Sequence, residues 1–458
     1  MKRWGPTAFF YSELIAGASD YTSGKVRNIS GLETPDALTL TIHLQRPAGD
    51  LATRLALSAV APIPPGAADG HDAGYGPYLA ASGPYMIEGS SRDGPATGYV
   101  RGTSLTLVRN PSWQRSSDPL RGAFVDRIEV TNLTGRDADD AGLSLLLAGK
   151  LDVVLDGDLS PTDLAKLRSQ PELAARLHFT QQAAARWITM NIAQPPFDDI
   201  HVRRAINYGA NKSAMVRAFD PTARVQTHAI PDSMEAGLLL DYDPYATPDH
   251  VGSLEKARSE MAQSRYDANH DGVCDVAACH GVVVLVSSND PAQVAIFNLL
   301  RSAAAPLGLD LKGQRIDDPQ RFVDRLEDPL SHIAAGVMDG WYSDYLNGSN
   351  WFVSLASRSS LSHSNPSLVG ATDAQLRTWG YKTTHVPGLE GKIDQCLGRT
   401  GLSQSECWAE ADQFLMERVV PWVPLLAPQS SRLTSDRVLS FSFDQSTALP
   451  ALDQIALK

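Results

Sequence analysis

The sequence lacks both a membrane-spanning segment and the common catalytic motifs. No apolar run approaches the roughly 18–20 residues that a helix needs to cross a bilayer. There is no G-x-S-x-G turn, no H-E-x-x-H pair, no P-loop and no G-x-G-x-x-G after a strand, and the 11 histidines form no i, i+4 pairs. A triad can be assembled from distant residues, but nothing marks a nucleophile. We therefore expect that the protein is not an enzyme.

The sequence has fewer basic residues than acidic ones. The 458 residues include 40 Lys and Arg against 52 Asp and Glu, which gives a formal net charge of -12. An acidic surface repels phosphate backbones and anionic lipids. We expect no nucleic-acid partner and no membrane-surface partner, and a soluble protein that meets small solutes.

Cysteine is scarce, and its spacing does not match the usual zinc motifs. Cys274 and Cys279 lie five residues apart and Cys396 and Cys407 lie eleven apart, so neither pair has C-x-x-C spacing. Four cysteines permit three disulfide connectivities, and we favour the two local pairings. Four buried free thiols are the alternative. Because disulfides persist in oxidising compartments, the pairing favours an extracytoplasmic protein.

A signal peptide is not visible either. The first residues, Met1–Pro6, are followed by no apolar h-region and by no small-residue cleavage site. Either the protein is cytoplasmic or its true start has been lost, and the cysteines favour the second explanation.

What is present is a long alternation of strand and helix patterns. With 43% hydrophobic residues, the chain can build a large core in at least two domains. Asp199 is expected to cap a helix, and Arg203 in the first turn to form a buried or lobe-bridging ion pair rather than a ligand contact. The alternation predicts an α/β fold, with strands over 125–130, 151–155, 187–191, 282–286 and 333–337 and helices over 139–149, 199–219, 253–264 and 292–305.

One loop has the spacing of the start of a calcium site. Oxygen ligands occupy positions one, three, five and nine, with glycine at six; the four are Asp267, Asn269, Asp271 and Asp275. Position twelve is Ala278, so the bidentate glutamate of an EF-hand is missing. We expect any bound calcium to be structural, and no other cofactor. The alternative is a solvated Asp-Gly turn that a disulfide orders.

Four segments, in order, resemble those of a known family. The first segment, Ser82–Pro111 with Asp126–Ile128, contains the patterns G-P-Y and R-N-P. The second, Asn191–Tyr208, contains P-P-F-x-D-x-x-V-R-x-A. The third, Gly340–Tyr345, reads G-W-x-x-D-Y, and the fourth, Cys407–Leu425, contains P-x-x-P-L. From about Val26 onward the chain is similar to the bacterial extracellular solute-binding proteins of family 5. That family includes the oligopeptide-, dipeptide- and nickel-binding components of ABC importers.

The resemblance implies an architecture. The family has a two-lobed periplasmic-binding-protein-like α/β fold (type II, cluster C) with a small extra domain. We assign 1–80 to a remnant of the extra domain, 81–185 with 433–458 to the first lobe, and 186–432 to the second lobe. The resemblance also implies that an amino-terminal portion is missing, with the signal sequence and lipid-attachment cysteine of a periplasmic or cell-surface lipoprotein.

The third segment is where the resemblance places ligand binding. In the peptide binders, the aspartate of G-W-x-x-D-Y faces the α-amino group of the ligand, and Asp344 matches that position. A fixed carboxylate suits an ammonium taken out of water, and Trp341, Tyr342 and Tyr345 offer apolar faces with polar tips. The alternative is that the aromatics are core residues and Asp344 caps a turn. The family commonly continues with proline-aspartate-proline, whereas Leu346–Asn350 reads Leu-Asn-Gly-Ser-Asn, which puts the shape of this loop and the preferred ligand in doubt.

The function that the resemblance implies is transport. We expect a monomer that holds a small peptide between its lobes and delivers it to the permease subunits of an ABC transporter. A nickel chelate or an oligosaccharide is the alternative ligand, and a secreted hydrolase is the alternative from another class. A metal chelate would require exposed His or Arg in the cleft and would be indifferent to Asp344.

Overall fold

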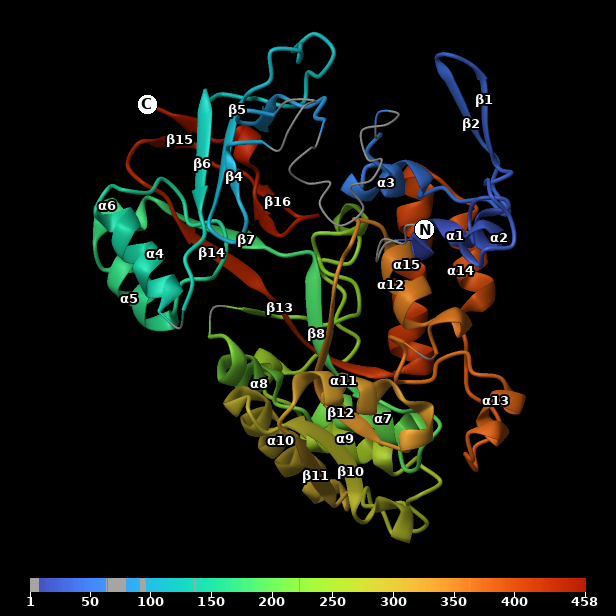
Figure 1. Ribbon diagram of the computed structural model, residues 1–458. Coiled ribbons are helices and arrows are strands. Elements are labelled where there is room, and N and C mark those ends of the chain that lie inside the picture. Colours follow the sequence, from blue (N-terminus) through green and yellow to red (C-terminus); the bar gives the residue numbers. More distant parts are fainter. Residues whose placement is uncertain are drawn as a thin grey trace. The chain divides into compact units, whose positions relative to one another are not determined.

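The computed structural model describes residues 8–62, 64, 80–90, 96–135, 137–221, 223–361 and 363–458 (Figure 1). Residues 1–6, from which the absence of a signal peptide was judged, lie outside these ranges. Contacts divide the chain into two compact units: unit 1 comprises Met1–Gln45, Leu55–Thr180 and Ser430–Lys458, and unit 2 comprises Arg46–Arg54 and Gln181–Gln429. The boundaries of the lobes and of the small extra domain stay a prediction.

Unit 1 contains an antiparallel sheet of four strands centred on β5. The long strand β5 pairs with β3 and β4 along one edge and with β6 along the other. Its apolar residues alternate with polar ones, as is typical of a half-buried antiparallel strand. The bounds are β3 (Tyr85–Ile87), β4 (Tyr99–Val100), β5 (Ser104–Arg109) and β6 (Arg127–Thr131).

Three helices and a strand pair form a second layer of unit 1. Leu146, Leu167 and Leu433 make its buried cluster, and the elements are α4 (Ala138–Leu147), α5 (Pro161–Arg168), α6 (Pro171–Ala174), β7 (Leu177–Gln181) and β14 (Gln429–Leu433). The strand predicted over 151–155 is wrong. Only Val153 forms a bridge there, with Thr434, because β14 pairs with β7 instead. The remaining elements are α1 (Phe9–Ser12), α2 (Ala18–Thr22), β1 (Leu32–Asp36), β2 (Thr39–Ile42), β15 (Val438–Ser440), β16 (Phe443–Asp444), β17 (Leu449–Pro450) and β18 (Ala456–Leu457).

Unit 2 is built on a six-stranded mixed sheet. Its strand order is β11-β10-β12-β8-β13-β9, with β10 parallel to both neighbours and the pairs of β8 antiparallel. The bounds are β8 (Ala184–Met190), β9 (Arg224–Val225), β10 (Val282–Ser287), β11 (Leu311–Ile316), β12 (Ala335–Tyr342) and β13 (Trp422–Ala427).

Helices cover both faces of this sheet (Figure 1). One face packs against α7 (Ile200–Gly209), α8 (Lys212–Phe219), α9 (Leu254–Met261) and α10 (Pro291–Ala304). The opposite face carries α11 (Pro319–Glu327), α12 (Gly348–Leu355), α13 (Asp373–Thr378), α14 (Glu390–Leu397) and α15 (Gly401–Phe414). The short helix α3 (Leu51–Leu55) begins in the Arg46–Arg54 segment of unit 2.

The sequence of β10 explains its central place. Val282–Val286 is an unbroken apolar run rich in valine, which suits a strand covered on both faces. Val284 packs into the cluster on one face and Leu285 into the cluster on the other. The alternation of strand and helix predicted for this half of the chain is therefore an α/β layer structure.

The helix predicted over 199–219 is two helices. Asp199 caps α7, as expected, by accepting a hydrogen bond from the N–H of His201 at 2.8 Å. The chain is extended at Ala210, and Asn211 caps α8 by accepting from the N–H of Ala214 at 2.9 Å. The apolar spacing persists across the break because both helices bury one face against the same sheet.

The ion pair predicted for Arg203 is wrong. The side chain is buried, with 3% exposed, but its guanidinium donates to main-chain carbonyls: to Phe197 at 2.6 Å and to Val419 at 2.7 and 3.0 Å. Val419 ends a helical turn, where carbonyl groups have no partner within the helix. Burial lowers the pKa of Arg203 to about 10. Arg203 thus stabilises the end of that turn.

Two disulfides lie in unit 2, Cys274–Cys279 and Cys396–Cys407, with S–S distances of 2.02 and 1.99 Å. This is the local connectivity among the three that four cysteines permit. Among the described residues, no helix is long and apolar enough to cross a membrane.

Candidate functional site

The end of β12 presents the predicted binding segment. Strand β12 runs antiparallel to β8, with Trp341 opposite Ala185 and Tyr342 opposite Ala184. The chain then leaves the sheet and bends before α12 begins at Gly348. The sheet register thereby fixes Trp341 and Tyr342, which lie three and two residues before the aspartate.

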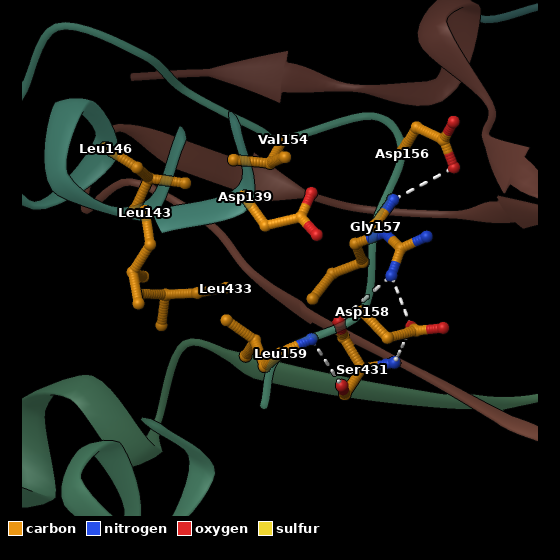
Figure 2. A pocket seen from close by; sticks show the side chains of 11 residues that line it. Asp139, Leu143, Leu146, Val154, Asp156, Gly157, Asp158, Leu159, Ser431 and Leu433 are labelled. Atoms are coloured by element: carbon orange, nitrogen blue, oxygen red, sulfur yellow. Dashed lines mark hydrogen bonds and ion pairs between the residues drawn. The ribbon is translucent and has the colours of Figure 1, made fainter. Parts of the chain in front are cut away.

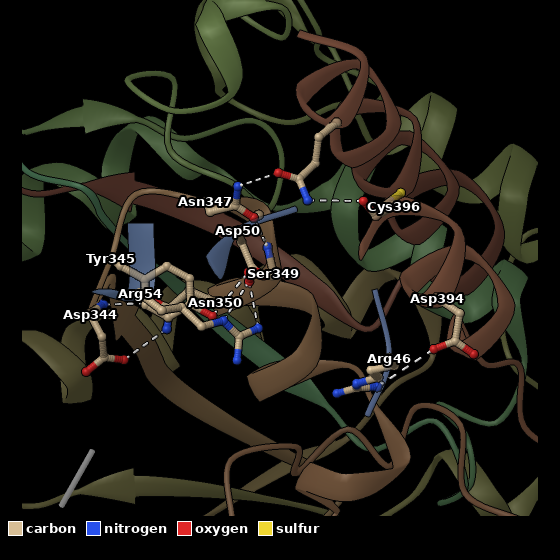
Figure 3. Close-up of polar contacts among 12 residues, drawn as sticks. Arg46, Asp50, Arg54, Asp344, Tyr345, Asn347, Ser349, Asn350, Asp394 and Cys396 are labelled. Carbon is tan, nitrogen blue, oxygen red and sulfur yellow. Dashed lines mark hydrogen bonds and ion pairs between the residues drawn. The ribbon is translucent and has the colours of Figure 1, made fainter. Parts of the chain in front are cut away.

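Asp344 lies just past the strand, and an asparagine holds it (Figure 3). Its N–H donates to Oδ1 of Asn350, and Nδ2 of Asn350 donates to Oδ2 of Asp344, both at 3.0 Å. The side chain is half-buried, and burial raises the pKa of Asp344. No lysine, arginine or histidine of the described residues forms an ion pair with it. The carboxylate is therefore oriented by the fold, and no cation within the described ranges neutralises it.

Asn350 is the residue that sequence reasoning missed. It is fully buried in α12, and its Oδ1 also accepts a hydrogen bond from Nε1 of Trp341 at 2.9 Å. One side chain thus links the half-buried indole to the aspartate. Asn350 lies in the Leu346–Asn350 segment, where the chain departs from the proline-aspartate-proline pattern of the family.

Tyr345 is buried under a second polar network. It is 3% exposed, its hydroxyl lies 3.1 Å from Oγ of Ser349, and the guanidinium of Arg54 lies 5.4 Å from its ring centroid. Arg54 in turn donates to Asp50 at 2.8 and 2.6 Å, and Asp50 also accepts from Ser349 (Figure 3). This packing favours the alternative that Tyr345 is a core aromatic, and its contact with a ligand stays a prediction.

The other two aromatics differ in exposure. Trp341 is half-buried and Tyr342 is 48% exposed, with the guanidinium of Arg186 lying 5.6 Å from its ring centroid. Tyr342 therefore offers an accessible aromatic surface two residues before Asp344. An aromatic face beside a carboxylate can hold the apolar and cationic parts of one solute.

A buried glutamate lies beside the start of α12. Glu235 is 8% exposed and accepts the N–H of Gly348, the first residue of that helix. Burial raises the pKa of Glu235 to about 7. The carboxylate lies at the positive end of the helix dipole, close to the loop that carries Asp344.

The carboxylate oxygens of the predicted calcium loop accept hydrogen bonds from N–H groups of the same loop. Asp267 is buried and accepts hydrogen bonds from the N–H groups of Asp271 and Gly272 at 3.3 and 2.7 Å. Asn269 donates through Nδ2 to Asp271, and Asp275 accepts two further loop N–H groups. Across the described ranges, no group of three or more His, Cys, Asp or Glu side chains is placed to hold a metal ion. These contacts favour the ordered-turn alternative, and calcium stays a prediction.

A separate pocket lies within unit 1 (Figure 2). One wall is apolar, from α4, the 154–159 segment and β14, and the other is charged. Arg432 is 4% exposed and donates to Asp158, and Asp139 and Asp156 also line the pocket, so its charged wall carries more acidic than basic groups. None of the residues singled out from the sequence lines this pocket.

Comparisons with known proteins agree with this fold. The family described as bacterial extracellular solute-binding proteins, family 5 Middle, matches residues 6–361. Among solved structures, the clavulanic acid biosynthesis oligopeptide binding protein 2 has a TM-score of 0.78 at 22% identity, covering 99% of this chain and 76% of that one. The predicted α/β fold of the solute-binding proteins is thereby confirmed.

Curated relatives match over part of their length. The glutathione-binding protein GsiB of Salmonella paratyphi A is 29% identical over 209 residues, which are 45% of this chain and 37% of that protein. Heme-binding protein A of Haemophilus influenzae is 21% identical over 355 residues, 76% of this chain and 56% of that protein. The matched segments thus span 37% of the length of the first relative and 56% of the length of the second.

Proposed function

The chain belongs to the bacterial extracellular solute-binding proteins of family 5, and from this membership we propose that it captures a peptide-like solute outside the cytoplasm and passes it to an ABC importer. It acts as a carrier and not as an enzyme, and its partners are the permease subunits. The names of two relatives, a glutathione binder and a heme binder, support a small organic solute. The name of the fold neighbour, an oligopeptide binder, supports a peptide.

The observation that carries the proposal is the carboxylate of Asp344, which forms no ion pair with any residue that the structure describes. A half-buried charge without an ion-pair partner costs stability, so its retention points to a cation that arrives from solution. A free α-amino group has the charge and the hydrogen-bond donors to complete it. Asn350 keeps the carboxylate in one orientation, which lowers the entropy that binding must remove.

The test substitutes Asp344 and varies the ligand. We expect Asp344→Ala to weaken binding of a peptide with a free α-amine by about 2–5 kcal/mol, because the ammonium then meets no carboxylate. Binding of the same peptide with an acetylated amine should change little. Isothermal titration calorimetry with the peptide that copurifies with the natively prepared protein measures both.

Asp241→Ala is the matched control, since Asp241 is an exposed aspartate of unit 2. It should leave both affinities unchanged. Equal losses for the free and acetylated peptides in the Asp344 variant would refute the assigned role. An affinity indifferent to Asp344 would instead favour a nickel chelate or an oligosaccharide. Turnover of peptide on incubation, followed by mass spectrometry, would establish a secreted hydrolase and remove the proposal.

A further inference from the structure

The loop that carries Asp344 is held on both sides by one short segment of unit 2. Before the aspartate, Oγ of Ser343 lies 3.3 Å from Sδ of Met234. After it, the carboxylate of Glu235 accepts the N–H of Gly348, the first residue of α12. Met234 and Glu235 are neighbours in the sequence, and both are buried. Two adjacent side chains therefore contact the chain on either side of the proposed ligand contact.

The hydrogen bond from Gly348 fixes the start of α12. The first N–H groups of a helix have no partner within the helix. Asn347 accepts those of Ser349 and Asn350, through its side chain at 3.0 Å and its carbonyl at 2.9 Å. Gly348 is buried, and its N–H is accepted by Glu235. A side chain from a distant segment thus completes the first turn of the helix.

Asn350 connects the start of α12 to the aspartate (Figure 3). It lies in the first turn of the helix, and its side chain forms two hydrogen bonds of 3.0 Å with Asp344. Nε1 of Trp351, the next residue, donates to Oγ of Ser343 at 2.7 Å. The orientation of the Asp344 carboxylate therefore follows the position of α12, which Glu235 fixes at its start.

The backbone at Glu235 has a conformation that residues with side chains disfavour. Glu235, Ala236 and Gly237 have φ angles of 49°, 55° and 70°, in the left-handed region that glycine adopts without strain. This turn packs against α15, and the hydroxyl of Ser405 in that helix hydrogen-bonds the Glu235 carboxylate. Such conformations persist where the surroundings impose them, and they cluster at ligand-binding and switch regions.

The charge of Glu235 has no counter-charge in the described part of the chain. Glu235 forms no ion pair there, and burial raises its pKa to about 7 against the opposing hydrogen bonds from Ser405 and Gly348. A proton taken up near neutral pH therefore removes the charge. The ionisable groups of the surrounding elements are acids or are already paired: Asp344 and Tyr345 in the loop, Glu406 and Glu410 exposed on α15, Asp412 of α15 with His228, and Asp50 with Arg54 at α3.

We infer that Glu235 is a positioning residue for Asp344: its ionised carboxylate anchors the start of α12, its protonation weakens that anchor, and the affinity for the solute falls as the pH drops below neutrality. This inference rests on the proposed function and adds a pH control to the same site. An ionised carboxylate accepts a stronger hydrogen bond than a neutral acid and is attracted to the positive end of the helix dipole. Because linkage is reciprocal, binding of a solute at Asp344 favours the ionised state of Glu235.

The first measurement needs no ligand. Hydrogen–deuterium exchange of residues 343–350 is followed at pH 7.5 and pH 6 in the unaltered protein and in Glu235→Gln, which keeps an acceptor for the N–H of Gly348 but cannot ionise. We expect the ratio of the two exchange rates, unaltered protein over variant, to rise about threefold from pH 7.5 to pH 6, as the loss of a charge at a helix terminus predicts. Exchange of the unaltered protein, referred to α10 of the same molecule, gives the same test without a variant.

The second measurement uses a pool of random tripeptides with free α-amines. Mass spectrometry quantifies the peptides that the protein retains after gel filtration at the same two pH values. Retention by the unaltered protein relative to Glu235→Gln should fall about threefold from pH 7.5 to pH 6. The α-amines and Asp344 are present in both samples, so their own titration cancels in this ratio.

Glu327→Gln is the matched control. Glu327 is a partly buried glutamate of unit 2 whose pKa burial also raises to about 7, but it lies at the end of α11. This variant should keep the pH dependence of the unaltered protein in both measurements.

An exchange rate of residues 343–350 that does not depend on pH beyond its reference overturns the inference and leaves the proposed function standing. A pH dependence of retention that persists in Glu235→Gln, or that Glu327→Gln also abolishes, overturns it in the same way. Retention of no tripeptide at either pH overturns the proposed function and the inference with it.

Discussion

The imidazole of His228 bridges two carboxylates in the interior of unit 2. Its Nδ1 lies 2.9 Å from Asp412 and its Nε2 lies 3.0 Å from Asp232. His228 and Asp412 are both fully buried, and Asp412 also accepts two main-chain N–H groups. Burial opposes a charge on the ring, but the two carboxylates outweigh it and raise the pKa of His228 to about 9. The ring is therefore a cation at neutral pH.

Replacement of His228 by Gln should cost stability in a pH-dependent way. The folded pKa of about 9 exceeds the ordinary value of 6.5, so the stabilising contribution is complete below pH 6.5 and is lost as pH rises through 9. The shift corresponds to roughly 3 kcal/mol at pH 6. Urea unfolding of both proteins from pH 6 to 9.5 should show their difference shrinking with pH. His385→Gln, on an exposed side chain, is the control, and a difference independent of pH would contradict the prediction.

Single residues also show the reach of sequence reasoning. The ligand-binding role of Asp344 was inferred from a local motif and stays a prediction, and Asp199 was identified as a cap because a cap lies next to its helix. Asp50 was not identified, because its contact with Ser349 joins residues 299 positions apart.

At the scale of elements, a helix pair supports the loop that carries Asp344. Cys396 in α14 and Cys407 in α15 are fully buried and disulfide-bonded. Trp408, next along α15, packs so close to Gly348 that a Cβ there would lie within 3 Å of the indole. The start of α12, and with it Asn350, therefore rests against this pair.

Removal of the α14–α15 disulfide should destabilise the protein more than removal of the other one. The chain-entropy relation gives about 3 kcal/mol for the loop of 11 residues between Cys396 and Cys407 and about 2 kcal/mol for the loop of 5 between Cys274 and Cys279. Paired Cys→Ser variants, compared by urea unfolding, measure both. The reverse order would contradict an entropic origin.

Element boundaries were harder to predict than element type. The apolar periodicity over 199–219 indicated helix correctly but passed over the break at Ala210 and Asn211. The Leu-Asp-Val-Val-Leu segment at 151–155 indicated a strand, yet β14 pairs with β7. Periodicity reports which side of a segment is buried, and it does not report which partner occupies the neighbouring ladder.

At the scale of the whole molecule, the net charge of -12 acts on every solute that approaches. A negative field attracts cations and repels anions, and salt screens it over about 10 Å at 0.1 M. We expect a tripeptide with a lysine side chain to associate faster than the same tripeptide with glutamate. Stopped-flow measurements should show this ratio falling toward one between 10 mM and 500 mM salt. A ratio that salt does not change would place the discrimination in the site itself.

The sequence alone determined the family and the α/β class, because motifs and hydrophobic periodicity are properties of neighbouring residues. Tertiary structure decided which charges are paired. The register of the strands placed Gly340 beside Arg186. The fold brought Asp50 into contact with Ser349, which lies 299 positions away in the sequence. Whether two charges pair depends on the distance between their segments. Folding sets that distance, and no local sequence pattern encodes it.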